Sequence, residues 1–270
     1  MWVANGRKSE YKVLAGLPEE NEYQGEKVMN PRKIVALLIV GGLVLGAVSA
    51  PALAEDNAVI KGKILFKGDP EKYKRSTLDT GKDANCTKKI GSEEVVLNKK
   101  ADPITIKNVI VSIKEGLGDR KFAPKTEAAV LDQTGCQYTP HVLAVMEGQS
   151  VTIRNSDPTN HNIHFLPKIN EELNKTQPKQ GMEDKITLKT EAPFKVKCDV
   201  HPWMGMHLAV FNHPFFGVTG DEGTYEIKGL PPGKYVVEAW HEKFGTVTAN
   251  VEVTSGATKD ADFTFEPDKK

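Results

Sequence analysis

The chain has 270 residues, 39% of them hydrophobic, and its 36 Lys and Arg residues balance 36 Asp and Glu residues, so that the formal net charge is zero. A balanced charge argues against nucleic acid and against a charged membrane surface as partners. The length suffices for two small domains, because domains commonly run about 100–150 residues.

An uncharged apolar run, IVALLIVGGLVLGAV, occupies residues 34–48. It follows a short basic flank and precedes a small-x-small site that ends at Ala54. These are the parts of a cleaved secretory signal, here residues 29–54. The run is shorter than the roughly 20 apolar residues that a membrane span needs. An uncleaved anchor, which would attach the protein to a membrane, is the alternative interpretation.

A long polar leader precedes this predicted signal. Signals rarely follow so many polar residues, so we expect translation to start at Met29 and interpret residues 1–28 as an artefact of the gene model. The mature chain would then begin at Glu55. We expect it to be exported to the periplasm, the cell envelope or the medium.

Three cysteines are present: Cys86, Cys136 and Cys198. Disulfides persist in exported proteins, so an odd count indicates one disulfide and one thiol with another role. Cys86 and Cys136 lie in turn-like sequences without a nearby histidine, whereas Cys198 lies among metal-ligand residues. We therefore predict a disulfide between Cys86 and Cys136, which would stabilise the fold by about 4 kcal/mol.

The sequence after residue 55 favours strands over helices. Alternating apolar and polar residues recur between clusters of Gly, Pro, Asn and Asp, which predicts an all-β sandwich or barrel. The predicted strands are residues 59–66, 94–97, 104–113, 142–145, 151–153, 185–188 and 194–197.

One short stretch concentrates soft metal ligands. The sequence CDVHPWMGM contains Cys198, His201, Met204 and Met206. Upstream, VTIRNSDPTNHNIHF breaks a strand and places His161 at the start of the next one. Two imidazoles, a thiolate and a distant thioether are the ligand set of blue copper.

With these motifs, residues 127–211 resemble the cupredoxin family and in particular its amicyanin, pseudoazurin and plastocyanin branch. The resemblance implies a Greek-key β-sandwich at residues 125–214 with one type 1 copper. It also implies that His161, Cys198 and His201 are the equatorial ligands. Asn162 resembles the residue that ties the two ligand loops together in this family.

The axial ligand remains open between two methionines. Amicyanin-like loops separate it from the histidine by two residues, which favours Met204, whereas pseudoazurin-like loops would use Met206. We expect His161 to be the buried ligand and His201 to be the outer one. We accordingly expect His201 to have an exposed edge, with Pro202 and Trp203 forming an electron-transfer surface.

Two further β segments flank the predicted copper domain. Residues 55–124 form an N-terminal segment that we expect to pack on the cupredoxin, because it contributes the predicted partner of Cys136. Residues 215–270 alternate over several short strands separated by Gly- and Pro-containing turns. They resemble a carboxypeptidase regulatory-like (transthyretin-like) domain, which implies a small β-sandwich and says little about function.

The leading hypothesis for function is a one-electron carrier that acts with a redox protein partner and binds no small-molecule substrate. Copper storage or delivery, or a metal-free envelope scaffold, are the alternatives. A copper enzyme is disfavoured because it needs a second copper site, often built from His-x-His pairs, and the chain has no such pair among its seven histidines. The histidines without ligand spacing, which we expect to be structural or exposed, are His141, His164, His207, His213 and His241.

Overall fold

The computed structural model describes residues 57–81, 83–86 and 89–269. These belong to one compact unit, Pro51–Lys270. The only helical element in the described ranges is a 3-10 helix, η1 (Ala84–Cys86), so the predicted all-β fold class is confirmed. The leader, the signal and the cleavage site lie outside the described residues. Among the residues that are described, no helix is long and apolar enough to cross a membrane.

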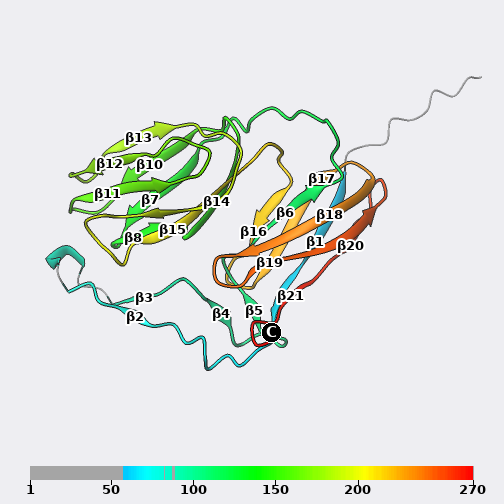
Figure 1. Ribbon diagram of the computed structural model, residues 1–270, viewed down its shortest axis with the longest axis horizontal. Coiled ribbons are helices and arrows are strands. Elements are labelled where there is room, and N and C mark those ends of the chain that lie inside the picture. Colours follow the sequence, from blue (N-terminus) through cyan, green and yellow to red (C-terminus); the bar gives the residue numbers. More distant parts are fainter. Residues whose placement is uncertain (1–56, 82, 87–88, 270) are drawn as a thin grey trace, which may run out of the picture. The chain divides into compact units, whose positions relative to one another are not determined.

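The central part of the chain forms a sandwich of two sheets (Figure 1). One sheet has the strand order β13-β10-β7-β8 and the other has the order β12-β11-β14-β15-β9. Two of the pairings, β10 with β7 and β15 with β9, are parallel, and the others are antiparallel. The strands are β7 (Ala129–Thr134), β8 (Gln137–Thr139), β9 (Val142–Met146), β10 (Val151–Asn155), β11 (His161–Leu166), β12 (Asn174–Gln177), β13 (Glu183–Ile186), β14 (Glu191–Lys197) and β15 (Gly205–Phe211).

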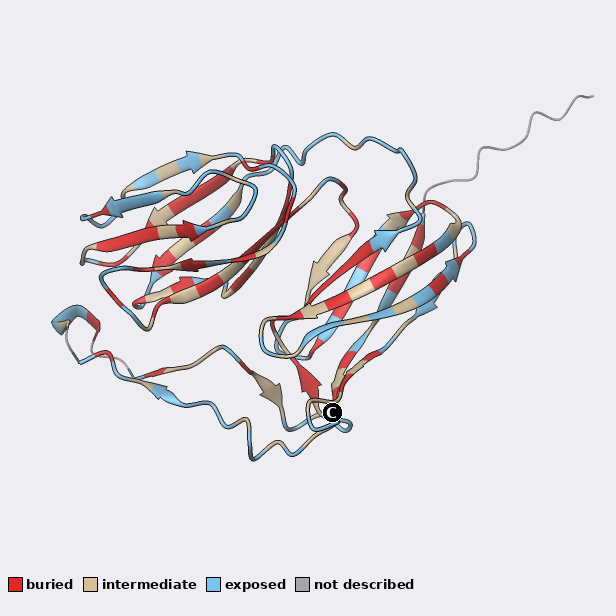
Figure 2. Cartoon of the chain, in the orientation of Figure 1, coloured by how far each residue is buried: buried red, intermediate tan, exposed pale blue. Residues whose placement is uncertain are grey.

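The core of this sandwich comes from alternate residues of both sheets. Leu131 and Ile153 from one sheet pack in a single cluster with Phe165, Val196 and Leu208 from the other, and all five are fully buried. Alternate residues of a strand point to opposite faces, so each strand contributes every second side chain to the core. Figure 2 shows buried residues on strands of both sheets. Burial of each such side chain contributes roughly 1.5–3 kcal/mol.

A second sandwich combines strands from the two ends of the chain. One sheet has the order β17-β1-β5-β4, with β20 and β21 also paired to β1, and the other has the order β16-β6-β18-β19. The strands are β1 (Ala58–Phe66), β4 (Leu97–Asn98), β5 (Thr105–Ile106), β6 (Ile110–Glu115), β16 (Phe216–Val218), β17 (Thr224–Leu230), β18 (Gly233–His241), β19 (Gly245–Val253), β20 (Thr258–Asp260) and β21 (Phe263–Phe265).

We expected the N-terminal segment to pack on the copper domain, but only part of this segment does so. Strand β1 pairs with β17 and β21, and β6 pairs with β16 and β18. The reason lies in the apolar face of β1, where Ile60 and Ile64 are fully buried in the core of the second sandwich. Residues 215–270 thus share their sandwich with strands from the N-terminal segment.

The segment between β1 and β4, in contrast, packs on the copper domain as expected. It contains the short hairpin of β2 (Thr77–Leu78) and β3 (Ile90–Gly91), with η1 between them. Cys86 and Ile90 are buried in the core cluster of the first sandwich. The predicted disulfide between Cys86 and Cys136 is present and fixes this segment to the turn between β7 and β8.

Candidate metal centre

Three of the predicted ligands come from two neighbouring strand ends. His161 begins β11, Cys198 follows the end of β14, and His201 lies in the loop that leads to β15. The loop is closed by backbone hydrogen bonds, in which Cys198 N donates to Met204 O at 3.2 Å and Met204 N donates to His201 O at 2.9 Å. Strands β11 and β14 are antiparallel neighbours, so the sheet brings these ends together.

The donor atoms of these residues converge. The Nδ1 atoms of His161 and His201 lie 3.0 Å apart, and Sγ of Cys198 lies 3.8 Å from Nδ1 of His201. One donor atom from each of the three residues lies within 4.8 Å of the others. His161 is 0% exposed, Cys198 is 3% exposed and His201 is 2% exposed. Cys198 is a free thiol, as predicted. A buried set of two imidazole nitrogens and one sulfur fits copper by the chemistry of its donors.

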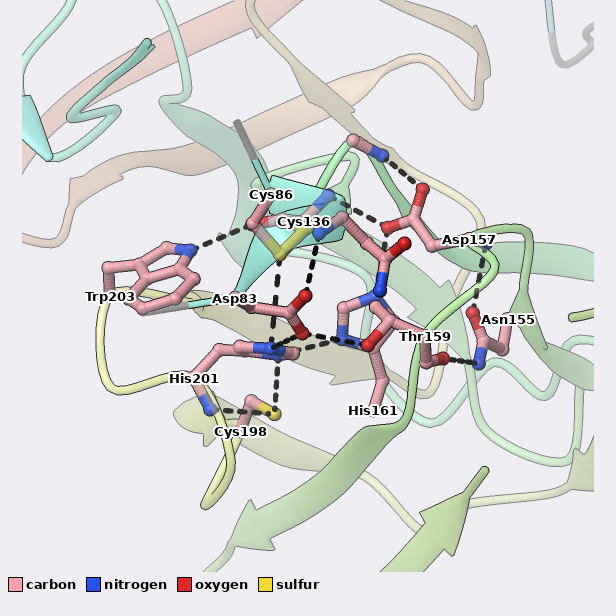
Figure 3. The surroundings of a disulfide bond; sticks show 12 residues. Asp83, Cys86, Cys136, Asn155, Asp157, Thr159, His161, Cys198, His201 and Trp203 are labelled. Atoms are coloured by element: carbon pink, nitrogen blue, oxygen red, sulfur yellow. Dashed lines mark hydrogen bonds and ion pairs between the residues drawn. A yellow bond between two sulfur atoms is a disulfide. The ribbon is translucent and has the colours of Figure 1, made fainter. Parts of the chain in front are cut away.

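Each imidazole is held from behind by a carboxylate (Figure 3). Nε2 of His161 lies 2.8 Å from Oδ2 of Asp157, and Nε2 of His201 lies 3.0 Å from Oδ2 of Asp83. A carboxylate on one ring nitrogen orients the ring and leaves the other nitrogen as the donor. Neither carboxylate was predicted from the sequence. Asp157 could have been suspected from its place in the strand break before His161.

Both carboxylates are themselves fixed. Asp157 accepts hydrogen bonds from the backbone N–H groups of Gly135 and Cys136 at 2.7 and 2.8 Å. Asp83 accepts one from the backbone N–H of Asn85 at 2.8 Å and one from the hydroxyl of Thr159 at 2.7 Å. These two bonds, together with the contact to His201, lower the pKa of Asp83 to about 2. Asp83 is therefore ionised at any ordinary pH.

Burial determines the charge of His161. Removal from water, supported by the nearby His201 ring, lowers the pKa of His161, and the hydrogen bond to Asp157 only partly opposes this shift. The imidazole is therefore neutral at neutral pH, which is the form that binds a metal ion.

Asn162 joins the two ligand segments, as the family resemblance implies. Its side-chain oxygen accepts a hydrogen bond from Asp199 N at 3.1 Å, and its own backbone N–H points to Sγ of Cys198 at 3.4 Å. His201 N also lies 3.4 Å from that sulfur. The side-chain nitrogen of Asn162 donates to Oδ1 of Asn174 at 2.7 Å. The sulfur thus accepts two backbone N–H groups, which stabilise a thiolate.

The expected exposed edge of His201 is absent, because His201 is only 2% exposed. Asp83 and Sγ of Cys86, which lies 3.9 Å from Nε2, cover that edge. Trp203 packs on the ring with 4.9 Å between ring centroids, and its indole N–H donates to Cys136 O at 3.1 Å. The disulfide between Cys86 and Cys136 holds this cover in place.

The remaining predicted residues divide into buried and accessible ones. Met204 and Met206 are both buried in the core cluster of this sandwich, so the choice of axial ligand stays a prediction. Pro202 is exposed and Trp203 is partly exposed. His164 contacts the carboxylates of Asp199 and Glu172 instead of the ligand set.

Two family models match the chain. Residues 125–211 match copper binding proteins of the plastocyanin/azurin family, and residues 202–266 match the carboxypeptidase regulatory-like domain. Both resemblances seen in the sequence are thereby confirmed. No curated protein sequence matches the chain significantly.

Similar solved structures cover about a third of the chain. A reduced Cu(I) form of an amicyanin mutant is 25% identical, with a TM-score of 0.28, and the match covers 37% of this chain and 97% of that one. A purple cupredoxin from Nitrosopumilus maritimus is 22% identical, with a TM-score of 0.27 and coverage of 30% and 98%. A Cu-containing nitrite reductase from Thermus scotoductus SA-01 is 19% identical, with a TM-score of 0.28 and coverage of 36%. The match spans only 25% of the nitrite reductase.

Proposed function

We propose that residues 125–211, a copper-binding domain of the plastocyanin/azurin family, hold one type 1 copper and pass single electrons to and from a protein partner. The observation that carries this proposal is the convergence of two Nδ1 atoms and one sulfur, from His161, His201 and Cys198, in a buried site. A copper ion bound there supplies a one-electron couple between Cu(I) and Cu(II).

The protein contributes a rigid ligand set. Asp157 and Asp83 fix the two rings, and Asn162 ties the loop of Cys198 to the strand of His161. Thiolate favours Cu(I), whereas imidazole accepts both oxidation states, so a fixed set of both reorganises little when an electron arrives. Water is excluded because all three ligands are buried.

Pro202 and Trp203 remain our proposal for the electron-transfer surface. Trp203 packs on His201 and is partly exposed, so it offers an aromatic contact between the buried ligand and a partner. Because the edge of His201 is covered, the expected route of electrons between the metal and a partner changes. Electrons would pass through Trp203 or the cover instead of through a bare imidazole edge.

We also propose that the protein is exported and acts as a carrier without a small-molecule substrate. The disulfide supports export, because such bonds persist in oxidising compartments. A closed ligand set supports a carrier, because a substrate would need an open position at the metal. Closure also argues against rapid copper delivery, the main alternative.

Visible absorption of the copper-loaded chain tests the proposal. A type 1 site gives strong sulfur-to-copper charge transfer, so the oxidised protein should be intensely coloured. Cys198→Ser should abolish the colour, since a neutral hydroxyl does not replace a thiolate. His164→Ala, a nearby histidine outside the ligand set, should keep it. A colourless Cu(II) form of the unmodified chain would remove the carrier hypothesis, whereas a coloured site that loses its copper quickly to a chelator would favour delivery.

A further inference from the structure

A second group of metal-ligand residues lies apart from the copper ligands. His141 Nε2 lies 2.5 Å from Oε1 of Glu242, and His207 Nδ1 lies 3.5 Å from Oε2 of the same carboxylate. One donor atom from each residue lies within 4.8 Å of the others. The side chains of His141, His207 and Glu242 are 12%, 18% and 14% exposed, respectively. The group is therefore largely but not completely closed to solvent.

The fold builds this group from both sandwiches. His141 directly precedes β9 and His207 lies in β15, and the two are joined because His207 N donates to His141 O at 3.0 Å. Glu242 lies in the turn between β18 and β19. Ile110, Val142 and Ala209 form a small buried cluster that joins β6 of the second sandwich to β9 and β15. The group therefore lies beside an apolar contact between the sandwiches.

The group contains an unsatisfied buried nitrogen. Nδ1 of His207 has no hydrogen-bond partner among the described residues, because the contact of 3.5 Å to Glu242 does not form a hydrogen bond. A buried polar atom without a partner is energetically unfavourable. A metal ion placed between His207 and Glu242 would use this nitrogen as a ligand.

The charges suit a cation. Burial lowers the pKa of His207, so its ring is neutral at neutral pH. Burial raises the pKa of Glu242, but the hydrogen bond and charge of His141 outweigh this effect and lower it, so the carboxylate is ionised. A neutral imidazole and an ionised carboxylate are the forms that bind metal ions.

A pocket of about 250 Å³ opens beside the group and leaves space for water at the remaining metal positions. Glu93 and Glu94 line it together with Glu242, and Lys195 is the cation in its lining. Met204 and Met206, the two candidate axial ligands, line the same pocket, and Met206 directly precedes His207 in β15, so the two candidate metal sites are neighbours.

We propose that His141, His207 and Glu242 form a second metal site that binds a divalent ion of the zinc and copper(II) class. Two imidazoles and one carboxylate are a ligand set that such ions accept, with the fourth position open to water. The sequence led us to expect that His141 and His207 are structural or exposed, and the proposal gives them a further role. Because Glu242 belongs to the other sandwich, the bound ion joins the two sandwiches and stabilises the folded chain.

The test uses the full chain with the first site disabled by Cys198→Ser and His201→Ala. This variant, freed of metal and titrated with Zn²⁺ alone and then Cu²⁺ alone, should bind one equivalent of ion in calorimetry. Its thermal unfolding midpoint should rise with the ion. Adding Glu242→Gln should weaken binding at least tenfold and remove the rise in midpoint, and His207→Gln should do the same.

Glu238→Gln is the matched control, since Glu238 lies in the adjoining strand β18 and pairs with Lys114 instead of the cluster. It should leave the binding unchanged. The proposal is overturned if the disabled chain binds neither ion, or if Glu242→Gln and Glu238→Gln bind equally well. Two of the three equatorial ligands of the first site, Cys198 and His201, are replaced throughout, so the difference between Glu242→Gln and Glu238→Gln reports on the second site.

Discussion

Oδ2 of Asp83 lies 3.0 Å from Nε2 of His201, so a carboxylate of the N-terminal segment closes the outer side of the proposed copper site. Figure 3 shows Asp83 beside the disulfide of Cys86 and Cys136, which ties this segment to the copper domain. The segment thereby places a fixed negative charge behind a ligand. We therefore expect the N-terminal β extension to influence the properties of a metal bound there.

Asp83→Asn should raise the reduction potential. The variant keeps the shape of the side chain but removes a charge that favours Cu(II) over Cu(I). A loss of about 1 kcal/mol of this attraction corresponds to a rise on the order of 40 mV. Potentiometric titration of the visible band measures it. Asp79→Asn, an exposed change in the same segment, should leave the potential unaltered, and equal potentials for both variants would contradict the role of Asp83.

Removing the disulfide should loosen the cover over His201. Cys86 and Cys136 are 50 residues apart, and replacing both with Ala should lower the free energy of unfolding by roughly 4 kcal/mol on the chain-entropy estimate. Urea denaturation measures this loss. Copper should also leave the variant faster in the presence of a chelator, because the segment that covers His201 is no longer held.

Thiol labelling checks the pairing in the unmodified protein. Denatured, metal-free chain should react at one cysteine without reductant and at three with it. Labelling of all three without reductant would show that Cys86 and Cys136 are unpaired.

The candidate ligand residues could be picked out from the sequence because their signal is local. Cys198 and His201 lie in one loop, and the break before His161 marks the second ligand segment. Asp83 could not be found in this way, since it is 118 residues from His201 and meets it only through the tertiary fold. The burial of His201 was missed for the same reason, because its cover comes from a distant segment.

The pairing of the strands could not be predicted from the sequence either. The alternation in residues 58–66 identifies β1 as a strand, but a two-residue period says nothing about its partner. Its pairing with β17 matches Ala58 with Leu230, at the other end of the chain.

His213 should make the protein less stable in mild acid. Burial lowers the pKa of its ring, which is 6% exposed and accepts a hydrogen bond from Phe215 N. The unfolded chain binds a proton at about pH 6.5 and the folded chain does so only at lower pH. Stability from this residue is therefore complete above pH 6.5 and is lost as the pH falls toward the lowered pKa.

His213→Asn keeps a hydrogen-bond acceptor and cannot titrate. Urea denaturation at several values between pH 7.5 and pH 5 should show a shallower decline for this variant, by at most about 1.4 kcal/mol per pH unit. Parallel curves for the two proteins would rule out His213 as a source of the acid sensitivity.

The axial ligand can be assigned by two matched substitutions. Met204 and Met206 are both buried in the same core, so replacing either with Leu is close to volume-conserving and should cost less than about 1.5 kcal/mol of stability. Met204→Leu should raise the reduction potential, because a thioether bond to the metal helps to stabilise Cu(II). Met206→Leu should leave the potential nearly unchanged if its sulfur serves only to fill the core.

Potentiometry of both variants beside the unmodified chain decides between them, with the visible spectrum as a check that His161, Cys198 and His201 still hold the metal. A raised potential in Met206→Leu alone would move the axial assignment to Met206 and leave the other three ligands in place. Equal shifts in both variants would instead indicate that the apolar packing around the site controls the potential. In that case neither sulfur acts as a specific ligand.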